Sequence, residues 1–373
     1  MEYAKYKLGD IVTFLNGRAY LMPELQDSGK YRILRVGNLS GGNDSWYYSD
    51  MELDENKYCE KGDLLYAWAC NFGPHIWKEE KVIFHYHIWK LVEDKKKVDK
   101  TYLYYYLLHQ TPFYLGGVNG ATMVHITKKN MEKKTAYIPS SLEVQHRIAS
   151  ILSTYDTLIE NNTKRIRFLE KMAENLYKEW FVRFRFPGHE KVEMENGLPK
   201  GWSRGSLSEI CKFKRGKNIT SSEMIEGLVP VISAGLEPSG FHNEANVKGV
   251  SVTMSSSGAN AGYIAIHYSC IWAADCSYIE DSTTPYIYYV YELLNNIRGV
   301  ISNFQRGAAQ PHVYPKDINR IKMIIPSEDL RCLANERLSV IHKQIHNFEQ
   351  QNTLLARQRD LLLPRLMSGK LEV

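Results

Sequence analysis

The 373-residue sequence has few of the features that mark membrane, secreted or zinc-binding proteins. It contains no run of about 18 apolar residues, and its first residues lack the basic start and apolar core of a signal peptide. The six cysteines form no Cys-x-x-Cys pair, so neither a zinc ribbon nor a disulfide framework is supported, and ordinary buried thiols are expected. We therefore expect a cytoplasmic protein with no membrane contact.

Motifs of several enzyme classes are also missing. There is no Asn/Asp-Pro-Pro-aromatic loop, no glycine-rich cofactor turn after a strand and no G-x-x-x-x-G-K-[ST] phosphate loop. Acidic strings with lysine occur between Asp50 and Lys57 and between Glu93 and Lys95, but such strings arise often by chance in a chain with 24% charged residues. We predict no catalytic residue.

Histidines occur at two spacings that could suit a metal ion. His342 and His346 lie one helical turn apart, but no third ligand is evident nearby and an exposed helix face is the simpler interpretation. His85 and His87 are interpreted as core or strand-face residues. The sequence therefore predicts no metal site.

The composition is that of a folded chain. With 44% hydrophobic residues and only 13 prolines, the sequence can form two or three domains. The net charge of +5 is too small to indicate a polyanionic partner by itself. A local basic cluster is a candidate nucleic-acid contact, although solvated lysines are the commoner explanation. Its members are Lys212, Lys214, Arg215 and Lys217.

The chain repeats itself. Residues 7–20 resemble residues 206–219, with Gly17 matching Gly216, and each block reads as a strand that ends at a glycine turn. Residues 120–143 resemble residues 307–330, and a tyrosine-rich segment precedes each copy. We therefore expect two copies of one mixed α/β domain, each followed by a long helix.

The two long helices are predicted from a heptad pattern of apolar residues. If the helices are antiparallel, one register pairs Leu152 with Leu362 and Asn162 with Asn352, while Pro364 should end or kink the second helix. The alternative is that each helix packs separately on its own domain. The predicted packing residues are Leu152, Ile159, Asn162, Ile166, Leu169 and Leu176 in the first helix, and Leu338, Ile345, Phe348, Asn352, Leu355 and Leu362 in the second.

Several segments resemble type I restriction-modification specificity subunits. They are LYKEWFVRFRFPGHE at 176–190, GLPKGW at 197–202, NGATMVHITKKNM near 119, SSGANAGYIAIHYSCIWAADC near 256, QRGAAQPHVYPKDI at 305–318 and the closing RDLLLPRLMSGKLEV. The resemblance covers essentially the whole chain, with two departures. Arg183 stands where an acidic residue is expected, and the second helix lacks the Gln-x-Arg-Ile-Ala start that Gln145 opens in the first.

The expected fold class is α+β, with two pseudo-repeated mixed α/β target-recognition domains separated by two long antiparallel coiled-coil helices. The expected segments are a first recognition domain at 1–140, a central spacer helix at 141–185, a linker at 186–200, a second recognition domain at 201–327, and a distal spacer helix with C-terminal tail at 328–373. Two domains held at the ends of such a spacer predict a bipartite DNA site with an unread gap.

The resemblance implies a non-catalytic subunit that binds double-stranded DNA and docks two modification (methyltransferase) subunits, which restriction subunits then join. It implies no cofactor in this chain, since S-adenosylmethionine, ATP and magnesium belong to the partners. Two alternatives remain: a self-contained nuclease or methyltransferase, and a protein scaffold that ignores DNA. Neither the DNA sequence nor the gap length follows from the residues.

Candidate DNA contacts are Arg, Lys, Asn, Gln, Ser, His, Thr and Tyr residues in glycine-containing loops after strands, although the same residues also favour turns. In the first domain they are Arg18, Tyr20, Arg35, Asn38, Asn71, His75 and Thr122. In the second they are Lys214, Arg215, Lys217, Asn218, Ser255, Ser256, Ser257, Asn260, Arg306 and Gln310.

Overall fold

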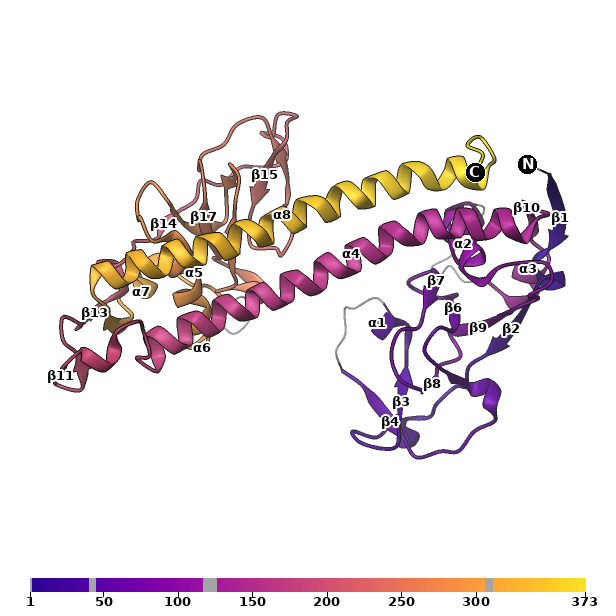
Figure 1. Ribbon diagram of the computed structural model, residues 1–373, viewed down its shortest axis with the longest axis horizontal. Helices are drawn as coiled ribbons and strands as arrows, with labels where there is room; N and C mark the ends of the chain where they lie inside the picture. Colours follow the sequence, from indigo (N-terminus) through magenta and orange to yellow (C-terminus); the bar gives the residue numbers. More distant parts are fainter. Residues whose placement is uncertain (1, 40–44, 117–125, 306–310) are drawn as a thin grey trace. The chain divides into compact units, whose positions relative to one another are not determined.

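The computed structural model describes residues 2–39, 45–116, 126–305 and 311–373 (Figure 1). The chain divides into two compact units: unit 1 comprises Met1–Glu160 with Thr353–Val373, and unit 2 comprises Asn161–Asn352. Two long helices, α4 (Leu142–Tyr177) and α8 (Glu328–Met367), contribute residues to both units. Each globular domain is therefore completed by pieces of both helices.

Unit 1 contains two four-stranded sheets, ordered β2-β9-β6-β7 and β4-β3-β8-β5, and the pair β1-β10. Its strands are β1 (Tyr3–Lys7), β2 (Val12–Asn16), β3 (Tyr31–Leu34), β4 (Tyr47–Ser49), β5 (Tyr58–Cys59), β6 (Leu64–Ala67), β7 (Gly73–Ile76), β8 (Val82–Phe84), β9 (Ile88–Glu93) and β10 (Thr135–Pro139). Its shorter helices are α1 (Val36–Leu39), α2 (Lys100–Leu115) and α3 (Lys128–Glu132).

Unit 2 contains a four-stranded sheet ordered β14-β20-β17-β18, a three-stranded sheet β16-β15-β19, and the pairs β13-β21 and β11-β12. Its strands are β11 (Met194–Glu195), β12 (Leu198–Pro199), β13 (Ser203–Ser206), β14 (Lys214–Arg215), β15 (Val229–Ile232), β16 (Gly240–His242), β17 (Ser251–Ser255), β18 (Ile264–His267), β19 (Trp272–Ala273), β20 (Cys276–Glu280) and β21 (Lys322–Ile325). Its shorter helices are α5 (Ile287–Asn296), α6 (Arg298–Ser302) and α7 (Pro315–Ile318).

The two units have the same strand connections, which bears out the internal repeat. The order β2-β9-β6-β7 in unit 1 corresponds to β14-β20-β17-β18 in unit 2. The other sheet of each unit contains one parallel strand pair, β3 with β8 in unit 1 and β15 with β19 in unit 2. The other described strand pairs are antiparallel. The pair β1-β10 likewise corresponds to β13-β21.

The repeated glycines occupy equivalent positions at the ends of β2 and β14. A Cβ atom on Gly17 would lie 2.3 Å from the carbonyl oxygen of His85, and one on Gly216 would lie 2.4 Å from that of Ala274. Both distances are far below van der Waals contact, so only glycine fits. The predicted glycine turns are therefore places where two backbones approach closely.

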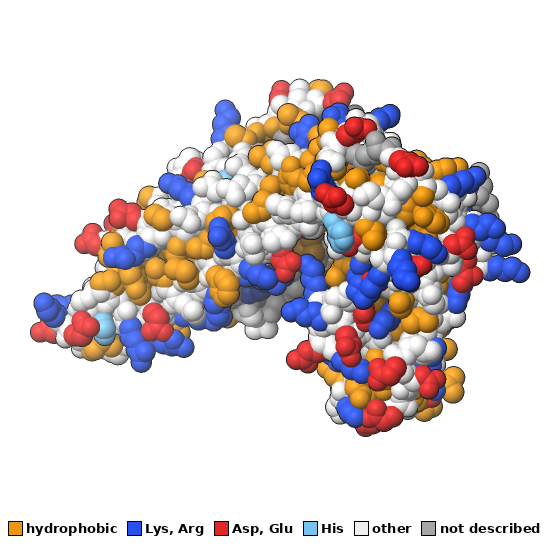
Figure 2. Space-filling view, turned by 45° about the vertical axis from the view of Figure 1, so that its right-hand side comes forward, with side chains coloured by type: hydrophobic (Ala, Val, Ile, Leu, Met, Phe, Trp, Pro, Cys, Tyr) orange, Lys and Arg blue, Asp and Glu red, His pale blue; other side chains and the backbone are white. Residues whose placement is uncertain are grey.

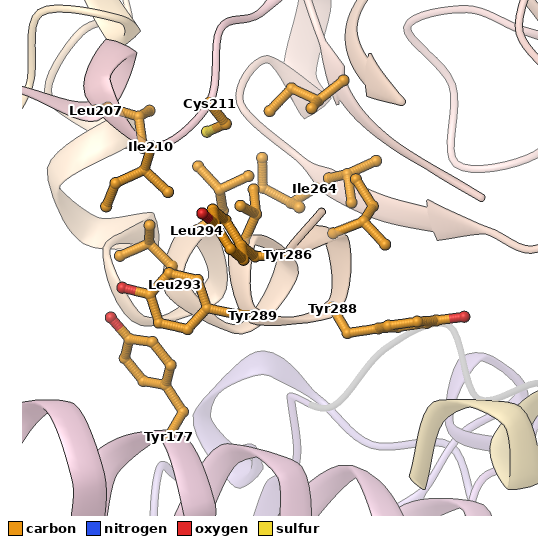
Figure 3. Close-up of a cluster of buried hydrophobic side chains, with 14 of the residues drawn as sticks. Tyr177, Leu207, Ile210, Cys211, Ile264, Tyr286, Tyr288, Tyr289, Leu293 and Leu294 are labelled. Carbon is orange, nitrogen blue, oxygen red and sulfur yellow. The ribbon is translucent and has the colours of Figure 1, made fainter. Parts of the chain in front are cut away.

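The tyrosine-rich segments form helices that line the two cores. Tyr102 and Tyr105 of α2 are fully or almost fully buried in unit 1. In unit 2, Tyr289 of α5 packs against Tyr177 of α4, with ring centroids 5.8 Å apart (Figure 3). Figure 3 also shows Leu293 of α5 in this cluster. The end of α4 is thus part of the hydrophobic core of unit 2.

A side-chain amide of a long helix hydrogen-bonds to the start of each tyrosine-rich helix. Gln145 of α4 is fully buried; it accepts a hydrogen bond from the Asp99 amide at 2.8 Å and donates to the Lys97 and Pro139 carbonyls. Asn335 of α8 accepts from the amide of Tyr288 at 3.0 Å. The start of α8 lacks the glutamine found in α4, and Asn335 of α8 makes the corresponding hydrogen bond in unit 2.

The long helices contact each other in an antiparallel sense within each unit. In unit 2, Asn162 Nδ2 donates to Gln351 Oε1 at 3.3 Å, and the guanidinium of Arg165 lies 5.5 Å from the Phe348 ring centroid. In unit 1, Arg359 of α8 pairs with Asp156 of α4. As residue numbers rise along α4, those of the contacting residues fall along α8.

The packing residues predicted from the heptads are all buried or half-buried. The expected contact between Asn162 and Asn352 differs in detail. Each amide bonds the residue beside its predicted partner, since Asn352 Nδ2 donates to Thr163 Oγ1 at 3.4 Å. Asn352 Oδ1 is buried and has no hydrogen-bond partner among the described residues.

The expectations that Pro364 ends the second helix and that all the thiols are buried were wrong. Pro364 lies inside α8, which continues to Met367, because a proline near a helix end removes few backbone hydrogen bonds. All six cysteines are free, but Cys70, Cys270 and Cys332 are exposed and only Cys59, Cys211 and Cys276 are buried. Arg183, the departure noted above, pairs with Glu179 one turn earlier, in the π-helical turn Lys178–Val182 that follows α4.

Candidate nucleic-acid interface

Four loops of unit 1 meet at one end of its sheets. Backbone hydrogen bonds join the loop after β2 to the end of β8, with the Arg18 amide 3.0 Å from the Phe84 carbonyl. The His85 amide donates to Leu34 at the end of β3, and the Trp68 amide, after β6, donates to His87 at 3.1 Å. Loops that meet in this way are where a rigid scaffold presents binding side chains.

Unit 2 repeats the same backbone contacts. The Lys217 amide donates to Ala273 at 2.9 Å, the Ala274 amide to Ile232 at 2.8 Å, and the Ser256 amide reaches the Asp275 carbonyl at 3.5 Å. His87 and Asp275 therefore hold equivalent positions, one in each unit. The loop from β8 to β9 is one residue longer than that from β19 to β20, and Tyr86 is the additional residue.

Arg18 and Tyr20 lie in the loop after β2 in unit 1. The Arg18 guanidinium already has hydrogen-bond partners within the chain, and the Tyr20 hydroxyl is buried. The Arg18 guanidinium donates to both carboxylate oxygens of Glu24, at 2.6 and 3.0 Å, and stacks over the Tyr20 ring. The Tyr20 hydroxyl is buried, and this burial raises its pKa. Arg18 can reach DNA only by exchanging or sharing its partner Glu24.

Arg35 and Asn38 follow β3. Asn38 Oδ1 accepts from the Arg35 amide at 3.1 Å, and the side chains of Arg35 and Asn38 both donate to the Ser45 carbonyl. The Arg35 guanidinium lies 4.4 Å from the Tyr47 ring centroid. Asn38 thus holds a turn, and the Arg35 guanidinium is oriented by an aromatic face.

The remaining residues predicted in unit 1 are scattered. Asn71 is exposed in the loop between β6 and β7. His75 is half-buried within β7, and burial lowers the pKa of its imidazole. Thr122 lies outside the described residues. Asn71 is thus open to a ligand, whereas His75 is partly enclosed.

The basic residues predicted in unit 2 lie at the end of β14 and are exposed. Lys214 pairs with Glu280 at 3.2 Å, and Arg215 with Asp275 at 3.4 Å. The Lys217 ammonium lies 5.9 Å from the Trp272 ring centroid, and Asn218 beside it is exposed. Arg215 and Lys217 therefore lie beside the β19–β20 loop, whereas Lys214 pairs with the far end of β20.

The serines predicted to touch DNA are buried. Ser255 donates to the Ala234 carbonyl at 2.9 Å, Ser256 lies against Ser277, and Ser257 donates to Asp275 Oδ2 at 2.6 Å. Their hydroxyls hold the loop after β17 and do not project from it. Asn260 is half-buried at 3.5 Å from the Ala234 carbonyl, and Arg306 and Gln310 lie outside the described residues.

An aromatic group in unit 1 was not predicted from the sequence. Trp68, Tyr86 and His87 pack together, with the Tyr86 and His87 rings 3.9 Å apart and Tyr86 39% exposed. His85 and His87 lie in the turn after β8, so the strand-face interpretation was wrong. Burial lowers the pKa of His85 to about 4 and also lowers that of His87. Both imidazoles are therefore neutral near pH 7. The sequence feature that could have predicted this group is the three consecutive aromatic residues His85, Tyr86 and His87 directly before β9.

The histidine pair on α8 is not an exposed face. His342 is buried, with Nε2 3.0 Å from Glu292 Oε1 and Nδ1 3.0 Å from the Tyr268 hydroxyl. Within the described ranges, no group of three His, Cys, Asp or Glu side chains is placed to hold a metal ion. The acidic strings serve local structure, since Asp50 accepts from the Lys30 amide and Asp94 from the Lys96 amide.

Charge alone does not mark an interface. Acidic and basic side chains are intermixed over the face that Figure 2 shows.

None of the helices in the described part of the chain has both the length and the apolar character needed to cross a membrane.

Comparison with known proteins agrees with the repeated fold. The model of the type I restriction modification DNA specificity domain matches residues 1–171 and again residues 199–359. The chain therefore belongs to this family and carries its domain twice.

Particular relatives agree with this family. The type I restriction enzyme MjaIX specificity subunit of Methanocaldococcus jannaschii is 28% identical over 309 residues, covering 75% of this chain and 71% of the relative. The HindI specificity subunit of Haemophilus influenzae is 22% identical over 335 residues, covering 67% and 72%. The crystal structure of a type I restriction-modification S subunit from M. genitalium superposes with a TM-score of 0.66 at 20% identity, covering 98% of this chain and 96% of that one.

Proposed function

We propose that this chain is the DNA-recognition subunit of a type I restriction-modification complex and that each of its two domains reads one half of a gapped, bipartite site. The observation that carries the proposal is the repeated set of loops, joined by the same backbone hydrogen bonds but carrying different side chains. One scaffold used twice with different loops can recognise two different short sequences.

The long helices are proposed to hold the two domains apart and to dock two modification subunits. Support comes from large apolar side chains that remain exposed on these helices, which is typical of protein interfaces. They are Leu158, Phe168, Met172, Val340, Leu354 and Leu361. S-adenosylmethionine, ATP and magnesium are then expected on the partner subunits, and restriction subunits join the same cytoplasmic complex.

The experiment that tests this division of labour is a domain exchange. Residues 1–140 are replaced by the corresponding segment of another family member, and the methylated motif is determined by sequencing the host genome for modified adenine. We expect one half of the motif to change and the other half and the gap to stay as before. A change in both halves would contradict the proposal.

The spacer is tested separately by inserting one heptad into each long helix. The gap between the two half-sites should lengthen while both half-sites keep their sequence. If the gap stays the same, the helices do not set the distance between the domains. Incubating the purified chain with DNA, magnesium and S-adenosylmethionine provides the control, since methylation or cleavage without added subunits would favour a self-contained enzyme.

A further inference from the structure

Asp275 is a carboxylate in a place where a DNA-binding loop ordinarily avoids one. It lies in the loop from β19 to β20, and its side chain is 33% exposed. Arg215, the last residue of β14, and Lys217, in the loop after β14, lie beside this loop, and both are exposed. Phosphates repel a carboxylate, so an aspartate here weakens DNA binding unless it meets a hydrogen-bond donor on the DNA.

The Asp275 carboxylate is oriented by two donors from its own domain. Ser257 donates to Oδ2 at 2.6 Å, and Arg215 donates to Oδ1 at 3.4 Å. An ionised carboxylate has about four acceptor positions, so capacity remains for a further donor. The side chain is therefore held in one orientation, with unused acceptor positions and access to solvent.

The equivalent position in unit 1 carries a different chemistry. The backbone contact that places Asp275 beside Ser256 places His87 beside Trp68. His87 packs edge-on against Trp68, with ring centroids 5.1 Å apart, and offers an imidazole in place of a carboxylate. The scaffold therefore presents a different side chain at the same point in each domain.

Resting on the proposed function, we propose that Asp275 is a specificity-determining residue that accepts a hydrogen bond from the exocyclic amino group of cytosine in the half-site of unit 2. This amino group is the major-groove donor that a carboxylate binds, whereas adenine is the base that an asparagine or glutamine amide binds. Thymine and guanine present a carbonyl oxygen at the corresponding position, which the carboxylate repels. The residue thus selects cytosine over a keto base at one position.

The test uses the full chain and duplexes based on the wild-type motif, which methylome sequencing supplies, with each position of both half-sites varied in turn. Asp275→Asn keeps the shape of the side chain but adds an amide donor, which can bind a keto oxygen. We expect the preference for cytosine to fall roughly 5- to 100-fold at one position of one half-site. All positions of the other half-site should keep their preference.

Two variants accompany this substitution. Glu209→Gln is the matched control, because Glu209 also accepts a serine hydroxyl, that of Ser206 at 3.0 Å, but caps the turn before β14. It should leave every base preference unchanged. Asp275→Ala removes the acceptor and should also relax the preference at that position. If this variant does not fold, the isosteric Asp275→Asn still decides the question.

The outcomes are distinguishable. If Asp275→Asn keeps every base preference, or weakens binding to all duplexes equally, Asp275 only positions Ser257 and Arg215 and the inference is overturned. If the wild-type chain prefers no DNA sequence at all, the proposed function fails, and the inference fails with it.

Discussion

The β8–β9 loop of unit 1 and the β19–β20 loop of unit 2 occupy the same place in two copies of one fold, yet they differ in length and chemistry. The first presents His85, Tyr86 and His87 against Trp68, and the second presents Asp275 among Arg215 and Ser257. Three backbone hydrogen bonds of the first loop have counterparts in the second, whereas the bond from the Tyr86 amide to the Arg18 carbonyl has none among the described residues of unit 2. A duplicated scaffold can therefore keep its backbone contacts while its loop side chains diverge.

Substitution of the two repeated glycines is expected to destabilise the shared scaffold more than any other change considered. Gly17→Val and Gly216→Val should each lower the free energy of unfolding of their own unit by about 3 to 5 kcal/mol, because the new side chain would overlap a carbonyl of the facing loop. Thermal unfolding followed by limited proteolysis would locate the damage. Gly299→Ala is the control, since a Cβ there meets open space in α6. A mild effect at either glycine would mean that the close approach is not required.

The two units differ in how deeply a polar pair that involves a long helix is buried. In unit 2 the pair between His342 and Glu292 is almost fully buried, with side chains 3% and 7% exposed. In unit 1 the Arg359 and Asp156 side chains are 23% and 30% exposed. His342→Ala should cost about 3 kcal/mol by leaving Glu292 buried and unpaired. Asp156→Ala should cost about 1 to 2 kcal/mol, because the pair with Arg359 is partly exposed but the Tyr105 hydroxyl also loses its acceptor.

Chemical denaturation of both variants measures this difference, and His342→Gln should recover part of the loss because an amide can still donate to Glu292. Equal losses for His342→Ala and Asp156→Ala would show that burial does not distinguish the two pairs.

Each unit also contains a histidine whose pKa burial lowers to about 4, His267 in unit 2 and His85 in unit 1. The unfolded chain takes up a proton near pH 6.5, but the folded chain does so only near pH 4, so stability is lost as the pH falls between these values. For His267 the loss should reach about 3 kcal/mol. His85, which is less buried, should contribute less.

The measurement is thermal unfolding between pH 7 and pH 4. His267→Gln should flatten the acid-induced loss more than His85→Gln does. A pH profile that neither substitution changes would contradict the neutral state inferred for both imidazoles.

The smallest expected effect concerns the extra residue of the longer loop. Tyr86 is 39% exposed, and its side chain can be removed without opening the core. Tyr86→Ala should weaken binding to the half-site of unit 1 by roughly 5-fold, a loss of about 1 kcal/mol, without changing the preference in the other half-site. Binding of duplexes altered in one half-site at a time would measure it. An equal effect on both half-sites would argue against separate recognition.

Much of the architecture was predictable because it depends on patterns that repeat. The glycine turns, the tyrosine-rich helices and the heptad positions recur at matching places in the two halves, and the structure shows the corresponding elements twice. Helix packing follows the spacing of apolar residues, which a sequence displays directly. The register was predicted to within one residue at Asn162.

The candidate site was predictable only as a set of loops. Sequence alone did not show that Ser255, Ser256 and Ser257 are buried, because serine in a glycine-containing loop serves equally as a turn former and as a surface donor. Nor did it identify Asp275 or His87, since their equivalence rests on backbone contacts between segments far apart in the chain. His342 was misjudged for the same reason, because its partner Glu292 lies on another helix.

Unit 2 is formed by one continuous segment of the chain and unit 1 by two, and this difference affects folding during translation. Unit 2 is one uninterrupted segment, Asn161–Asn352, whereas the core of unit 1 includes Leu363, Leu366 and Met367 near the end of the sequence. Domains usually complete in the order in which the ribosome releases them. Here the domain translated first needs residues of Thr353–Val373, which are translated after unit 2, before its core can close, so the domain translated second can finish first. A nascent chain stopped before α8 emerges would then expose apolar surface to chaperones and proteases in its N-terminal half.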